Sequence, residues 1–71
     1  MTTRIIAKSE EMQRARISKG WSCARLGRES GVTGQSISRI ERGDYTSPST
    51  AKKIADTLGL PVNDLFTIDA K

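Results

Sequence analysis

Four glycines divide the sequence into segments of helical length. Gly20, Gly31, Gly43 and Gly59 each follow a run long enough for a short helix, and glycine is the residue most often found just past the end of a helix. Period-two alternation of β-branched residues does not persist in any of these runs, which argues against strands. The glycine spacing therefore predicts short helices joined by tight turns.

Size and cysteine content restrict how such a fold is stabilised. The chain has 71 residues, one cysteine and no histidine, so it forms no internal disulfide and is poorly equipped for a zinc site. We expect one domain, residues 1–71, near the lower size limit for a stable core and with no cofactor. The lone thiol suits a reducing, cytoplasmic setting. No apolar run reaches the roughly 18 residues of a membrane helix, so no membrane partner is expected.

Capping residues mark where the helices begin. Ser22 and Thr33 are good N-caps, because a hydroxyl accepts a free N–H of the first turn. Ser47 followed by Pro48 is the clearest start in the chain. The pair Ile5–Ile6 either extends the first helix or packs separately. The expected helices are Ser9–Lys19, Cys23–Ser30, Gly34–Glu41, Pro48–Leu58 and Val62–Phe66.

The positive charge is concentrated in the middle of the chain. The net charge is +4, and seven basic residues but only two acidic ones fall between Arg14 and Arg42. A local basic excess is typical of a surface that binds a polyanion. An ordinary solvated face has the same composition, so charge alone does not decide between the two interpretations.

The polar segment GVTGQSISRIERG, residues 31–43, favours binding to a polyanion over an ordinary solvated face. Ile37 and Ile40, with Val32 before them, give this segment one apolar side, and the remaining positions are polar or glycine. Only this one side of the helix can pack against a core, so the polar side is available to contact a partner. Two short helices joined by a tight turn that contains glycine are typical of a helix-turn-helix.

The residues that carry this pattern also carry a family resemblance. The stretch WSCARLGRESGVTGQSISRIERG, followed by SPSTAKKIADTLGLPVNDLF, resembles the Cro/repressor-type (XRE-like, lambda-repressor-like) helix-turn-helix DNA-binding family over about residues 9–66. The resemblance implies an all-α, compact five-helix domain in which helices two and three form the helix-turn-helix, about residues 22–42. It also implies a homodimer that binds a palindromic double-stranded DNA operator.

By position, the resemblance assigns base reading to the start of the third helix and to a residue one turn later. Gln and Arg are suited to this role, since each pairs bidentately with one base and contributes about 1–3 kcal/mol of discrimination. Gly34 stands where relatives often have a polar side chain. The base-reading candidates are Thr33, Gln35, Ser36 and Arg39.

Phosphate contacts are implied at two further places. The first is the N-terminus of the second helix, where free N–H groups attract an anion, and the second is the turn after the third helix. These places hold Ser22, Cys23, Arg42, Gly43 and Tyr45. For Tyr45, packing over the turn is an equal alternative. Three more residues are candidates for phosphate contacts because of their positive charge alone: Arg14, Arg25 and Arg28.

Two further groups are assigned structural or assembly roles. The resemblance implies an ion pair between Arg16 of the first helix and Glu41 of the third. The C-terminal segment, residues 60–68, has more apolar residues than a short terminal helix needs. They either fill the core or form a two-fold dimer interface, and they are Leu60, Val62, Leu65, Phe66 and Ile68.

We therefore expect a homodimeric transcriptional regulator, a repressor or controller protein, that binds a palindromic operator. The alternative is an antitoxin that also binds a protein toxin. An enzyme is not expected, because the sequence lacks histidine and any paired nucleophile and base. No small-molecule effector is expected. A redox-sensing role for Cys23 is a minor alternative to a small residue at a helix start.

Overall fold

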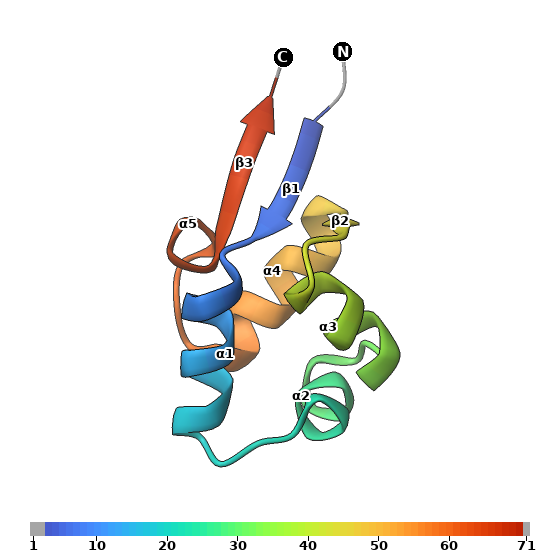
Figure 1. Cartoon of the computed structure of the whole chain (residues 1–71), viewed down its shortest axis with the longest axis vertical. Helices are drawn as coiled ribbons and strands as arrows, with labels where there is room; N and C mark the ends of the chain where they lie inside the picture. The colour runs from blue at the N-terminus through green and yellow to red at the C-terminus, as the bar shows by residue number, and fades with distance from the viewer. Residues whose placement is uncertain (1–2, 71) are drawn as a thin grey trace.

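Five helices follow one another in two groups, separated and flanked by short strands, in the structure, a computed structural model that describes residues 3–70 (Figure 1). Within that range the chain forms five helices and three strands. In chain order they are β1 Thr3–Ala7, α1 Ser9–Ser18, α2 Cys23–Ser30, α3 Gly34–Glu41, β2 Tyr45–Thr46, α4 Pro48–Leu58, α5 Val62–Leu65 and β3 Phe66–Ala70.

Three of the helices begin at the capping residues expected from the sequence. The hydroxyls of Ser22, Thr33 and Ser47 each accept a hydrogen bond from the backbone N–H three residues later. The first helix differs, because its N-cap is Lys8 and no side chain caps it. Ser9 instead donates to the backbone oxygen of Glu41, at 2.7 Å, and so ties the start of α1 to the end of α3.

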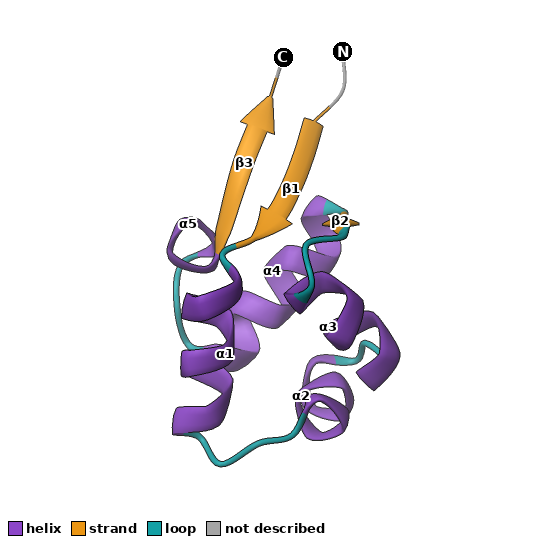
Figure 2. Cartoon of the chain, in the orientation of Figure 1, coloured by secondary structure: helices purple, strands orange, loops and turns teal. Residues whose placement is uncertain are grey.

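The five expected helices are present, but the fold is not strictly all-α as expected. The three strands form an antiparallel sheet in the order β2-β1-β3. Figure 2 shows β1 and β3 as a ribbon that leaves the helical part of the molecule, with the start of β1 and the end of β3 at its tip. This ribbon accounts for the elongated shape, which measures 37 × 20 × 19 Å.

The sheet explains two details that the helical prediction missed. Ile5 pairs with Ile68 on one side and with Thr46 on the other, and its side chain is buried, so the Ile5–Ile6 pair belongs to a strand rather than to α1. Phe66 is the first residue of β3. The fifth helix therefore ends at Leu65, one residue earlier than expected.

The apolar core lies between the helices and the base of the sheet. The largest fully buried side chains come from β3 and from every helix, and they are Phe66, Met12, Leu26, Ile37, Ile54 and Leu65. Burial of each such side chain stabilises the fold by about 1.5–3 kcal/mol. Among the residues described, no helix has the length and apolar character needed to cross a membrane.

Candidate nucleic-acid interface

The turn between α2 and α3 is built on a very close approach of two backbones. A Cβ atom added to Gly27 would lie 2.6 Å from the backbone nitrogen of Gly34. A Cβ atom added to Gly34 would lie 2.9 Å from the Cα atom of Ala24. The backbone N–H of Val32 donates to Gly27 at 2.8 Å and closes the turn. Gly34 is therefore needed for packing, which the sequence did not reveal.

Helix α3 divides into a buried side and an exposed side. Ile37 and Ile40 are 0% and 4% exposed and fix the helix to the core. Gln35 and Arg39, one turn apart, are exposed together on the other side. Ser36 is half-buried, and its hydroxyl accepts a hydrogen bond from the hydroxyl of Thr33 at 2.9 Å. Of the four base-reading candidates, Gln35 and Arg39 thus have the freest side chains.

A shallow groove joins α3 to the segment that follows it. It is lined by Ser36 and Arg39 of α3 together with Asp44 and Tyr45. Tyr45 is 61% exposed, so it stands at the border of the α3 surface rather than in the core. Asp44 was missed by the sequence interpretation, although an acid in the same groove as Arg39 opposes the approach of a polyanion.

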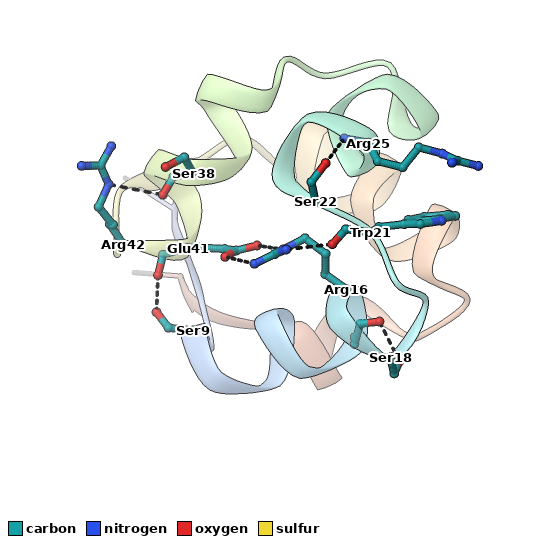
Figure 3. Close-up of polar contacts among 10 residues, drawn as sticks. Ser9, Arg16, Ser18, Trp21, Ser22, Arg25, Ser38, Glu41 and Arg42 are labelled. Atoms are coloured by element: carbon teal, nitrogen blue, oxygen red, sulfur yellow. Dashed lines mark hydrogen bonds and ion pairs between the residues drawn. The ribbon is translucent and has the colours of Figure 1, made fainter.

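Two cations lie near the ring of Trp21, just before α2, and Figure 3 shows one of them, Arg25. The charged ends of Lys19 and Arg25 each lie 5.3 Å from the centre of the Trp21 ring. Arg25 also donates to Glu29 at 2.8 Å, on an exposed face. The hydroxyl of Ser22 already accepts the N–H of Arg25. Part of the phosphate-binding capacity expected at this helix end is therefore used within the chain.

The other phosphate candidates lie at different places on the molecule. Arg42 and Gly43 follow α3 and are exposed, and Arg42 makes a long 3.4 Å hydrogen bond to the backbone of Ser38. Arg28 is exposed on α2, and Cys23 is half-buried against the core. Arg14 lines a separate groove between α1 and α5 with Leu60 and Leu65. The structure does not bring Arg14 together with α3.

Arg16 and Glu41 form a bidentate ion pair that joins α1 to α3 (Figure 3). The two N–O distances are 2.7 and 3.1 Å, and the side chains are 13% and 7% exposed. The same guanidinium donates to the backbone oxygen of Trp21 at 2.8 Å. The hydrogen bond that Arg16 donates to Glu41 raises the pKa of Arg16 against the opposing effect of burial. The pair is satisfied within the domain and is not part of the exposed α3 surface.

The residues assigned to a dimer interface differ in how far they are buried. Leu65 and Phe66 are each 1% exposed and belong to the core of the monomer. Val62 is half-buried against that core. Leu60 and Ile68 are 37% and 46% exposed, so they are the members of the set that remain accessible.

Comparisons with known proteins agree with this arrangement of helices. A family model described as helix-turn-helix matches residues 12–65. The HTH-type transcriptional regulator SlrR of Bacillus subtilis (strain 168) is 44% identical over 50 residues, which cover 68% of this chain. Those residues make up 33% of SlrR, so the chain matches about a third of that protein's length. The family resemblance inferred from the sequence is confirmed: the chain belongs to the XRE-family helix-turn-helix proteins.

Proposed function

We propose that the protein is a transcriptional regulator that binds double-stranded DNA by inserting α3 into the major groove. The observation that carries this proposal is the division of α3, whose Ile37 and Ile40 are buried while Gln35 and Arg39 are exposed one turn apart. Membership of the helix-turn-helix family supports it, since the second helix of that motif reads base edges. The excess of basic residues around the motif supports binding to a polyanion.

Each part of the surface has a distinct role in this proposal. Arg39 pairs with guanine and Gln35 with adenine, through two hydrogen bonds each. Thr33 and Ser36 are shorter, and their hydroxyls bind each other at 2.9 Å, so they contribute less to discrimination. Phosphates are bound at the start of α2, by Ser22 and Cys23, and in the turn after α3. The contributors there are Arg42, Gly43 and Tyr45, with Arg25 and Arg28 adding charge.

We also propose that two copies bind a palindromic operator. A two-fold dimer of helix-turn-helix domains presents two recognition helices one turn of DNA apart, so a palindromic site matches its symmetry. Leu60 and Ile68 support a contact between copies, because they are exposed apolar residues of the C-terminal segment. Repression follows where such an operator overlaps a promoter.

Selection from a pool of random duplexes tests the base-reading proposal. We expect an enriched palindromic motif, and we expect Gln35→Ala and Arg39→Ala each to relax selection at one position per half-site. Arg28→Ala is the matched control, because an exposed phosphate contact weakens binding to all sequences equally. Enrichment of no motif, together with tight salt-sensitive binding, would replace this proposal with nonspecific binding of polyanions.

Sedimentation with and without the selected duplex tests the dimer. We expect two copies per palindromic duplex and a weaker second binding step in Leu60→Asp and Ile68→Asp. Ile17→Asp is the control, because Ile17 is 60% exposed on α1, outside the C-terminal segment. Independent binding of single copies to isolated half-sites would rule out the dimer while leaving base reading intact.

A further inference from the structure

Arg4, on the N-terminal strand, lies against an aromatic residue next to the recognition helix. Its guanidinium carbon is 5.6 Å from the centre of the Tyr45 ring. The register of the sheet explains this contact, because Ile6 pairs with Tyr45 and side chains two apart on a strand lie on the same face. Arg4 is therefore the neighbour of Ile6 on the face that carries the tyrosine.

Tyr45 connects Arg4 to the surface of α3. The tyrosine lines the same groove as Ser36 and Arg39, and the residue is 61% exposed. Arg4 is itself exposed. A series of side chains thus runs from the recognition helix to the sheet, and it joins the N-terminal strand to the middle of the sequence. In Figure 1, β1 lies beside β2, which follows α3 directly.

The guanidinium of Arg4 is available to an anion. Asp69 is its register partner on β3, yet within residues 3–70 Arg4 takes part in no ion pair. A cation–π contact does not require the N–H groups of the guanidinium to bond to the ring, so they remain able to donate. A planar fork of donors fits the oxygens of a phosphate.

We propose that Arg4 contacts a phosphate of the DNA backbone and that Tyr45 holds its guanidinium in place for that contact. The sheet thereby extends the DNA-binding surface beyond the helix-turn-helix itself, to a residue outside the part of the chain that matches the family. This inference rests on the proposed function, since it assumes that α3 and Tyr45 face DNA.

The salt dependence of binding measures this contact. We would compare the wild type with Arg4→Gln on a labelled duplex that carries the selected motif and on a scrambled duplex of equal length. A lost phosphate contact lowers the slope of log K against log salt by about 1 and weakens binding to all sequences alike. We expect this change for Arg4→Gln on both duplexes, with an unchanged melting temperature.

Lys8→Gln is the matched control. It removes the same charge from the same end of the chain, but the Lys8 ammonium donates to the backbone oxygen of Asn63 in α5 at 2.9 Å. We expect its slope to equal that of the wild type. Equal slopes for wild type, Arg4→Gln and Lys8→Gln would overturn the inference. The scrambled duplex keeps this result distinct from a failure of base reading, which shows as equal binding to both duplexes.

A double-mutant cycle tests the part assigned to Tyr45. We expect Arg4→Gln to have its full effect in a Tyr45→Phe background, because the ring remains. In a Tyr45→Ser background we expect a smaller effect, because the guanidinium is no longer held. Equal effects of Arg4→Gln in both backgrounds would show that the ring does not position the arginine.

Discussion

Gly27 and Gly34 meet where α2 crosses the start of α3, and neither position has room for a methyl group. The neighbouring atoms belong to the backbone, 2.6 Å and 2.9 Å from the added Cβ atoms, so they do not move aside cheaply. Helix propensity alone predicts that Gly27→Ala stabilises by about 1 kcal/mol. We expect the opposite sign, a loss of about 2 kcal/mol for Gly27→Ala and somewhat less for Gly34→Ala.

Chemical denaturation measures both changes. Gln35→Ala is the control, since it alters an exposed position beside Gly34 and surface changes stay within about 0.5 kcal/mol. An increase in stability for Gly27→Ala would mean that the two helices separate without cost.

The Arg16–Glu41 ion pair predicts a large effect when one partner is removed. We expect Arg16→Met to cost about 3 kcal/mol, because Glu41 is 7% exposed and loses its partner. For a domain of this size the melting temperature should fall by about 10 °C or more. We expect the double variant Arg16→Met/Glu41→Leu to recover most of this loss.

Lys52→Gln is the control for that prediction, because its ion pair with Asp56 is 67% and 61% exposed; it should cost less than about 0.5 kcal/mol. An unchanged melting temperature in Arg16→Met would remove the structural role of the pair.

The raised pKa of Arg16 sets the pH range over which this residue stabilises the fold. The stabilisation is fully present below the pKa that Arg16 has in the unfolded chain, and it is lost only as the pH rises through the higher pKa of the folded state. The contribution of Arg16 is therefore retained at neutral and moderately alkaline pH.

The sheet predicts that two isoleucines respond differently to the same change. Ile5 is 3% exposed at the centre of the sheet, whereas Ile17 is 60% exposed on α1. We expect Ile5→Ala to lower the free energy of unfolding by about 3 kcal/mol and Ile17→Ala to change it by less than about 0.5 kcal/mol. Denaturation curves for the pair provide the measurement. Equal, small effects would argue that β1 is not part of the folded domain.

Neutralising Asp44 should increase the affinity for DNA. Its carboxylate shares a groove with Arg39 and Tyr45, and removing its charge reduces repulsion of phosphates. We expect Asp44→Asn to bind any duplex several-fold more tightly at low salt. Asp64→Asn makes the same change of net charge in the groove between α1 and α5 and should have a smaller effect. Equal gains would assign the effect to net charge alone.

Local signals made the helices predictable. The caps at Ser22, Thr33 and Ser47 and the glycines after them lie within a few residues of the elements they bound, and α2, α3 and α4 have the expected limits. The Arg25–Glu29 pair also follows from i, i+4 spacing, although the sequence interpretation passed over it.

The strands were missed because their partners are distant in sequence. Adjacent Ile5 and Ile6 obscure the alternation in β1, whose pairing depends on residues from the other end of the chain. The segment Phe66–Ala70 does alternate, with Phe66 and Ile68 apolar and Thr67 and Asp69 polar. That signal was readable, but the same residues were interpreted as a helix end and a dimer surface.

Parts of the site lay beyond sequence reasoning for a similar reason. The Arg16–Glu41 pair spans 25 positions, and only the family resemblance suggested it. The need for glycine at position 34 depends on how α2 and α3 cross, and the place of Arg4 beside Tyr45 depends on strand register. The base-reading role of Gln35 and Arg39 remains a prediction.

The pairing of Thr3 with Ala70 gives the folding reaction a late, non-local step. This contact closes a loop that contains all five helices, and it costs the most chain entropy of any contact in the sheet. Strands β1 and β3 should therefore pair only after the helices have packed. A circular permutant that joins residue 70 to residue 3 by a short turn would make this contact local. Its ribbon should form early, and the whole chain should fold faster.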